Sequence, residues 1–264
     1  MKATVFLSEE QRVTTLEDII EILNQANIIY SRRKPDFGIV VGGDGFFSYC
    51  GAVKRIPLLF VGIPSYSPIG SKAYLAETYL HDLPRALQRI KEGRFKIVEH
   101  KMLKVYLNQD VLDDIFTDVY LERGLDSNCL RYKLMVEGSN FSFVDLAIGN
   151  GVIITTPAGS TGYFSYIDKI TNGEWLNVNG FTRLNEDEVG ICHILPTFTL
   201  REGTSLHPLR YRVPYGVTIS IKLLRSGDAR LYSASYPRRG VRVTEQDIVK
   251  IGPSEKVVKL IHLL

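Results

Sequence analysis

The chain has 264 residues, which is ample for two compact domains. Hydrophobic residues make up 45% and charged residues 23%, the ordinary balance of a folded globular protein rather than of a disordered one. With 32 basic and 29 acidic side chains the net charge is only +3, so no basic face indicates nucleic-acid binding.

Strand and helix signals alternate over the first part of the chain. The first helix has an apolar stripe, with Thr14 or Thr15 as its N-cap, and the second stops at Gly93. This alternation predicts an α/β domain over residues 1–97, with a parallel, Rossmann-like sheet covered by helices. The expected elements are strands over 3–7, 37–41 and 58–63 and helices over 15–26 and 83–92.

After residue 97 the helical periodicity gives way to short β-rich runs separated by turn signals such as Gly138-Ser139-Asn140. We expect an all-β, β-sandwich-like domain over residues 98–264, entered through a crossing segment over 94–99. Its last residues are expected to pack back on the first domain. The expected strands cover 102–107, 115–122, 132–136, 141–147, 152–155, 217–224, 229–233, 240–243 and 247–251.

The strand over 37–41 ends in the sequence Gly42-Gly43-Asp44-Gly45. Ligands of parallel sheets bind beyond the carboxyl ends of the strands, and consecutive glycines let backbone N–H groups approach phosphate oxygens. Asp44 is no simple phosphate ligand because like charges repel. It suits a base for a hydroxyl, or a carboxylate acting through a bridging Mg²⁺. The alternative is a tight turn in which Asp44 only bonds its own backbone.

A second polar segment, Thr155-Thr156-Pro157-Ala158-Gly159-Ser160-Thr161-Gly162-Tyr163, follows the apolar run over 152–154. Its threonine and serine residues concentrate hydroxyls in a short stretch, while proline and glycine determine its turn. Tyr163 adds a flat aromatic face or a phenol. An ordinary polar loop is the alternative, since these residue types dominate loops in general.

The pairing of a GGDG loop after an apolar strand with a downstream TPxGSTxY segment resembles the NAD kinase family. Residues 86–103 and 243–251 are similar to the family's crossover and closing strands, so the resemblance covers nearly the whole chain. GGDG alone is shared with lipid kinases and phosphofructokinases, whereas TPxGSTxY is much more specific. The resemblance implies transfer of a phosphoryl group from ATP or polyphosphate to the 2′-hydroxyl of NAD, giving NADP, with Mg²⁺ or another divalent cation.

The resemblance also implies roles for particular residues. Asp44 is expected to be the base that activates the 2′-hydroxyl of the adenosine ribose, while Gly42, Gly43 and Gly45 keep the loop thin for the phosphates. The expected partners are small-molecule nucleotides, with no nucleic acid, in a homo-oligomer (dimer or tetramer). The residues expected to contact the dinucleotide are Asp118, Asn150, Thr156, Ser160, Thr161, Gly162 and Tyr163.

The chain departs from the family pattern around the expected dinucleotide pocket. Phe46 follows GGDG where the family usually has Thr or Ser, and Thr117-Asp118 stands where it has Asn-Glu. Gly149-Asn150-Gly151 replaces Gly-Asp-Gly, residues 164–175 replace a glycine-rich stretch, and an insertion reaches Gly70. These changes leave two further hypotheses open: a non-catalytic dinucleotide-binding or regulatory protein, or a kinase for another hydroxyl, of a lipid or sugar.

The remaining chemistry-bearing residues predict no separate site. Three widely spaced cysteines form no disulfide framework or CxxC pair, which favours a reducing compartment. The five histidines show no metal-ligand spacing, so no protein-held metal is expected. No apolar stretch approaches the roughly 20 residues that a membrane helix needs, and the first residues do not resemble a signal peptide. We therefore expect a cytoplasmic protein without a membrane partner.

Overall fold

The computed structural model describes residues 1–9, 11–63, 71–125, 127–170, 183–225, 227–234 and 240–264. The insertion over 64–70, Trp175 and Ser226 therefore lie outside the described residues. The chain divides into a first unit, residues 1–100 and 257–264, and a second unit, residues 101–256. Strands β6 (Phe95–Leu107) and β18 (Val249–Leu263) each contribute residues to both units.

The first unit is built on a parallel sheet. Strand β1 pairs with β3 in the register Ala3↔Phe37, and β3 pairs with β4 in the register Gly38↔Leu58. The end of β18 adds a parallel bridge, Leu260↔Leu58, which brings the last residues of the chain into this unit. The elements are β1 (Lys2–Leu7), α1 (Leu16–Gln25), β2 (Ile29–Tyr30), β3 (Phe37–Gly42), α2 (Asp44–Val53), β4 (Leu58–Gly62), β5 (Thr78–Tyr79), η1 (Leu80–Asp82) and α3 (Leu83–Lys91).

Local chemistry explains where the first helix begins. The Thr15 hydroxyl accepts a hydrogen bond from the Asp18 amide at 3.2 Å, and the Asp18 carboxylate accepts one from the Thr15 amide at 2.8 Å. This reciprocal capping box satisfies two backbone donors that an open helix end would leave unpaired. The helix then buries Ile19 and Leu23 in the core of the first unit.

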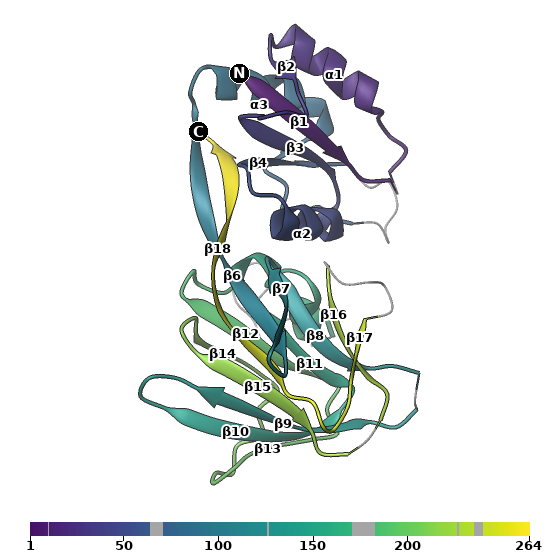
Figure 1. Cartoon of the computed structure of the whole chain (residues 1–264), viewed down its shortest axis with the longest axis vertical. Helices are drawn as coiled ribbons and strands as arrows, with labels where there is room; N and C mark the ends of the chain where they lie inside the picture. The colour runs from purple at the N-terminus through teal and green to yellow at the C-terminus, as the bar shows by residue number, and fades with distance from the viewer. Residues whose placement is uncertain (10, 64–70, 126, 171–182, 226, 235–239) are drawn as a thin grey trace. The chain divides into compact units, whose positions relative to one another are not determined.

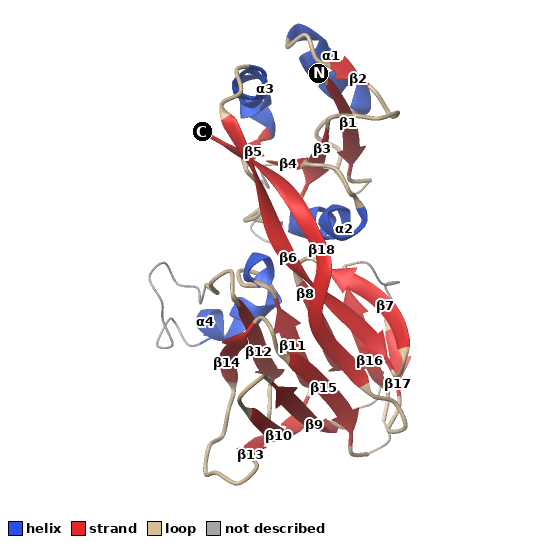
Figure 2. Cartoon of the chain, turned by 60° about the vertical axis from the view of Figure 1, so that its left-hand side comes forward, coloured by secondary structure: helices blue, strands red, loops and turns tan. Residues whose placement is uncertain are grey.

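Helices cover both faces of the parallel sheet. Ile39 and Val41 of β3 lie in one core with residues of α1 and α3. On the opposite face, the ring of Phe47 from α2 stacks on Phe60 of β4, with ring centroids 4.7 Å apart. Figure 1 and Figure 2 show α2 across strands β1, β3 and β4 from α1 and α3. The continuous apolar sequence of these strands follows from burial on both faces.

The second unit consists of two β-sheets that enclose one hydrophobic core, to which both sheets contribute side chains. One sheet runs in the order β13-β10-β9-β15-β18, with β6 pairing β18 and β7, and the other in the order β14-β12-β11-β8-β16-β17. Figure 2 shows how strands dominate this unit. The elements are β7 (Asp110–Ile115), β8 (Asp118–Arg123), β9 (Leu130–Glu137), β10 (Ser142–Gly149), β11 (Gly151–Thr155), η2 (Pro157–Gly159), η3 (Tyr163–Ser165), α4 (Tyr166–Ile170), β12 (Glu188–Ile194), β13 (Phe198–Arg201), β14 (Arg210–Pro214), β15 (Thr218–Leu223), β16 (Ala229–Ser233) and β17 (Val241–Val243).

The α/β first unit and the β-rich second unit confirm the predicted fold class, but several expected elements were wrong. The strand expected over 115–122 is interrupted at Phe116 and Thr117, because their carbonyls accept hydrogen bonds from Thr156 instead of extending a ladder. The crossing segment expected over 94–99 lies mostly within β6, a continuous strand. Among the described residues, no helix combines the length and apolar character that spanning a membrane requires.

Candidate active site

Asp44 is the first residue of α2, directly beyond the carboxyl end of β3. Gly43 is the N-cap residue of this helix, and a Cβ on it would lie 2.7 Å from the Cβ of Ser71. Any larger residue would therefore displace Ser71 from the helix end. Gly45, in contrast, has open space around it, since a Cβ added there would meet no atom within 4 Å. Of these two glycines only Gly43 is required by packing, while Gly45 leaves the backbone accessible.

The Asp44 carboxylate is held by a segment far along the chain. One oxygen, Oδ1, accepts a hydrogen bond from the Leu75 amide at 2.9 Å, and Oδ2 accepts one from the Ser71 hydroxyl at 3.1 Å. The Ser71 Oγ in turn accepts hydrogen bonds from the amides of Asp44, at 3.1 Å, and Ala73, at 3.2 Å. Asp44 is thus not a turn residue that bonds only its own backbone. Each carboxylate oxygen can still accept a further hydrogen bond or contact a cation.

Phe46 lies on the first turn of α2, where the resemblance leads one to expect a hydroxyl. Its Cδ1 would be 3.0 Å from a Cβ on Gly42, so the ring packs closely over this glycine. Its ring also lies 6.4 Å from that of Tyr49, centroid to centroid. Because the side chain at position 46 has no hydroxyl, the hydroxyl that contacts Asp44 comes from Ser71.

In the second unit, the polar segment starts where β11 ends. Thr155, the last residue of β11, pairs with Asp118, the first residue of β8. The Thr156 amide then donates to the Thr117 carbonyl at 2.8 Å, and its hydroxyl donates to the Phe116 carbonyl at 2.6 Å. Two 3-10 turns, η2 and η3, follow. The segment is therefore anchored to the break between β7 and β8, next to Asp118.

Most hydroxyls of this segment stabilise the turn itself. The Thr155 hydroxyl donates to the Thr117 carbonyl at 3.2 Å, and the Ser160 hydroxyl donates to the Pro157 carbonyl at 2.7 Å. Both side chains are buried. A Cβ on Gly159 would lie 2.3 Å from the Thr155 hydroxyl, so glycine is needed there for close approach. The hydroxyl-rich composition of the segment therefore has a structural cause, and its accessible part is the backbone at the exposed Gly162.

Asp118 and Tyr163 flank that exposed backbone. The Asp118 Oδ2 atom lies 3.8 Å from the position of a Cβ on Gly162, and its Oδ1 accepts a hydrogen bond from the Thr117 hydroxyl at 3.2 Å. Burial raises the pKa of Asp118 to about 6. The Tyr163 hydroxyl donates to Glu122 at 3.3 Å, and burial raises the pKa of this phenol. The result is a carboxylate, an open backbone turn and a tyrosine side by side.

Asn150 is not brought together with these residues within the chain. It lies at the opposite end of β11 from Thr155, where its carbonyl accepts from the Arg123 amide at 2.9 Å. The backbone amide of Asn150 donates to the Ile194 carbonyl at 2.8 Å. The role expected for Asn150 in dinucleotide binding stays a prediction. The glycine-Asp44 group belongs to the first unit and the Asp118 group to the second.

Sequence reasoning missed Ser71 and Leu75. They follow Asp44 by 27 and 31 residues, next to an insertion without a family counterpart, and no short motif marks them. Glu122 was also missed, although its spacing of four residues from Asp118 on an expected strand is visible in the sequence. These two carboxylates lie on the same face of β8 because side chains alternate along a strand.

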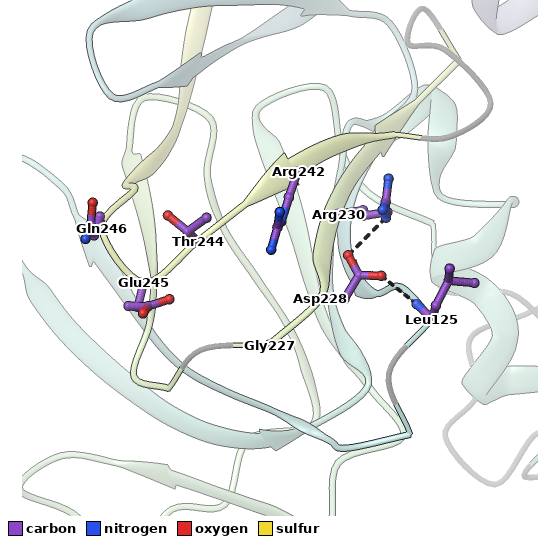
Figure 3. Close-up of a pocket in the computed structure, with 8 residues that line it drawn as sticks. All are labelled: Leu125, Gly227, Asp228, Arg230, Arg242, Thr244, Glu245 and Gln246. Carbon is purple, nitrogen blue, oxygen red and sulfur yellow. Dashed lines mark hydrogen bonds and ion pairs between the residues drawn. The ribbon is translucent and has the colours of Figure 1, made fainter.

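A pocket of about 710 Å³ in the second unit contains none of the expected site residues. Figure 3 shows its lining, with Arg230 and Arg242 on neighbouring strands. Asp228 accepts hydrogen bonds from Arg230 at 3.1 Å and from the Leu125 amide at 2.7 Å. The Asp228 carboxylate thus offsets the charge of Arg230.

In comparison with known proteins, the chain is similar in sequence to NAD kinases. The NAD kinase of Acetivibrio thermocellus is 34% identical over 148 residues, which are 53% of this chain and 47% of that protein. The chain spans about half the length of the curated relatives it matches. No family model matches the chain.

Two solved structures share the fold over the whole chain. Yeast NADH kinase, complexed with NADH, has a TM-score of 0.73 at 14% identity, with 84% of that chain covered. An NAD kinase from Archaeoglobus fulgidus, in complex with ATP, has a TM-score of 0.66 at 17% identity, with 94% covered. The chain thus shares its fold with these two proteins. In sequence, the chain is similar to curated NAD kinases over about half of their length.

Proposed function

We propose that this protein is a kinase that transfers the terminal phosphoryl group of ATP to the 2′-hydroxyl of NAD, giving NADP. The observation that carries this proposal is the carboxylate of Asp44, held by Ser71 and Leu75 at the start of α2 and beyond the end of β3. The curated relatives named NAD kinase support it. Polyphosphate is the alternative donor.

In the proposed reaction, Asp44 accepts the proton of the 2′-hydroxyl as that oxygen attacks the γ-phosphorus of ATP. A new bond forms from the ribose oxygen to phosphorus, the bond from phosphorus to the β–γ bridging oxygen breaks, and ADP leaves with the electron pair. Phosphoryl transfer depends on positioning and charge stabilisation rather than on covalent catalysis. A carboxylate with both oxygens held by hydrogen bonds is a well-positioned acceptor for such a proton.

The same carboxylate fits a Mg²⁺ ion that arrives with the nucleotide phosphates. Mg²⁺ is usually bound through one or two carboxylates together with substrate phosphates and waters. Among the described residues no group of three or more His, Cys, Asp or Glu side chains has metal-holding geometry. Such an ion would neutralise phosphate charge, and Asp44 is the residue that would contact it.

For the dinucleotide, we propose contacts with Asp118, Gly162 and Tyr163, which adjoin in the second unit. Thr156, Ser160 and Thr161 would act mainly by holding this turn, since they are buried. We further propose that the protein is a homo-oligomer, a dimer or tetramer.

The second candidate is a dinucleotide-binding protein without catalysis. Thr117 favours it, because its hydroxyl donates to Asp118 at 3.2 Å and cannot replace the two-sided hydrogen bonding of an asparagine amide at this position. This candidate requires binding of NAD without turnover.

The test is an assay of the purified full chain with NAD, ATP and Mg²⁺, coupled to an NADP-specific dehydrogenase. Parallel reactions contain polyphosphate as donor or NADH as acceptor. NADP formation that depends on Asp44 supports the kinase. Calorimetric binding of NAD without turnover with any donor would instead support the non-catalytic candidate, and absence of both would refute the two together.

A further inference from the structure

Two histidines face each other on neighbouring strands of the first unit. His100 lies on β6 and His262 on β18, two strands that pair although the residues are 162 positions apart in sequence. Their Nε2 atoms are 3.5 Å apart, and their ring centroids are 5.8 Å apart. Both side chains are partly buried, and the His262 side chain is 34% exposed, so ions from solvent can reach it.

Glu77 determines the orientation of His262. The Glu77 Oε2 atom lies 2.9 Å from Nδ1 of His262, and its Oε1 accepts a hydrogen bond from the Leu263 amide at 2.8 Å. A carboxylate at this distance places a proton on Nδ1 and, in the neutral ring, leaves the lone pair on Nε2. That lone pair is directed at His100. Metal-ligating histidines commonly donate their second nitrogen to a carboxylate in this way.

The separation of the two Nε2 atoms suits a shared ion better than a direct hydrogen bond. Hydrogen bonds from N–H donors typically span about 2.7–3.2 Å, and 3.5 Å lies beyond this range. Two imidazole nitrogens at about 2.0–2.1 Å from one tetrahedral ion lie about 3.3–3.4 Å apart. We propose that His100 and His262 bind a divalent transition-metal ion of the zinc type, with Glu77 orienting His262.

The ligand chemistry limits which ion this site takes. Neutral imidazole nitrogens suit Zn²⁺, Cu²⁺ and Ni²⁺, whereas Mg²⁺ and Ca²⁺ prefer oxygen ligands. No third His, Cys, Asp or Glu side chain among the described residues joins the two histidines. Water would complete the coordination of the ion. The bound ion would hold β6 against β18 within the first unit. The two histidines lie on β6 and β18 and Asp44 lies on α2, so the site is separate from the proposed phosphoryl-transfer site.

The experiment is a calorimetric titration of the tag-free, chelator-treated full chain with Zn²⁺, repeated with Mg²⁺. We expect a single Zn²⁺ per chain and a higher melting temperature with Zn²⁺. His100→Gln and His262→Gln should each weaken binding at least tenfold. Glu77→Gln should weaken it by about 10–100-fold, as is usual for a carboxylate behind a metal-bound histidine.

His81→Gln is the matched control, because His81 is exposed and pairs with Asp82 at 3.0 Å in the same unit. Its Zn²⁺ affinity should equal that of the wild type. X-ray absorption at the zinc edge of the wild-type complex needs no variant and should show two imidazole ligands. Absence of Zn²⁺ binding by the wild type, or undiminished binding in both histidine variants, would overturn the proposal.

Discussion

The Ser71 hydroxyl contacts Asp44 twice: it donates to the Oδ2 atom and accepts from the backbone amide, with both distances 3.1 Å. One hydroxyl thus links the side chain and the main chain of the same residue at the start of a helix. The Leu75 amide holds the other carboxylate oxygen at 2.9 Å. These contacts hold the Asp44 carboxylate in one orientation, on which the effects expected for Asp44→Asn and Ser71→Ala depend.

Asp44→Asn should abolish most turnover while leaving the affinity for NAD nearly intact. The amide keeps the size of the carboxylate but cannot accept a proton, and loss of a general base typically costs about 10²–10⁴ in rate. Steady-state assays and calorimetry with NAD measure the two effects. Asp110→Asn, at an exposed position, is the control and should behave as the wild type. Unchanged turnover in Asp44→Asn would show that Asp44 is not the base.

Ser71→Ala should lower kcat about tenfold, or about 1.4 kcal/mol in activation free energy, with little change in KM for NAD. The reason is that the carboxylate loses one of its two hydrogen bonds and becomes free to rotate, while the NAD contacts stay in place. Ser31→Ala, whose hydroxyl donates to the Arg33 carbonyl, is the control for loss of a turn hydroxyl. A rise in KM with unchanged kcat would contradict a positioning role.

Affinity for NAD should fall as the pH falls from 7 to 5. Burial raises the pKa of Asp118 to about 6, so the carboxylate gains a proton in this range and becomes a weaker hydrogen-bond acceptor for the adenosine. Above pH 7 the affinity should be constant. Calorimetric titrations across this range measure the effect, and Asp118→Asn should bind more weakly and independently of pH. An affinity of the wild type that does not change between these pH values would exclude Asp118 from the contact.

Asp118→Asn should weaken NAD binding but raise the folding stability at neutral pH. The raised pKa means that the folded protein binds this proton more tightly than the unfolded chain does, so ionisation opposes folding above pH 6. The variant should therefore gain on the order of 2 kcal/mol in the free energy of unfolding at neutral pH and little at pH 4. Urea unfolding at both values tests this. Equal gains at both would show that ionisation is not the cause.

Asp145→Asn should destabilise the second unit by about 3–5 kcal/mol, since it breaks a buried ion pair and leaves Arg201 uncompensated. Asp145 is fully buried and accepts from Arg201 at 2.8 and 3.1 Å. Burial raises its pKa, but the nearby His193 ring and the hydrogen bonds from Arg201 and Tyr211 outweigh this and lower it overall. The stabilisation is thus present at neutral pH and lost as the pH falls below about 4. Thermal unfolding measures the loss, with Asp110→Asn as control.

Local sequence signals predicted many elements of the fold but missed others for identifiable reasons. Helix α2 was not predicted. Its start is rich in glycine, and its apolar residues do not form the single stripe by which an amphipathic helix is recognised. Strands β12, β13 and β14 were also missed. They form by pairing with strands elsewhere in the second unit, and their own sequences were not recognised as strand patterns. In the site, the Thr-Pro segment was recognised from its composition. The hydrogen bonds that the Thr155 and Ser160 hydroxyls donate to backbone carbonyls were not predicted.

The sequence by itself determined the features that depend on residues close together in the chain. The capping box of Thr15 and Asp18, the apolar strand before Gly42 and the turn at 138–140 depend on backbone sterics and hydrogen bonds over a few residues. Only the tertiary structure decided that Ser71 holds Asp44 and that His100 faces His262. Such pairs depend on the register and order of strands far apart in sequence, which the burial of the whole core determines and which no short pattern encodes.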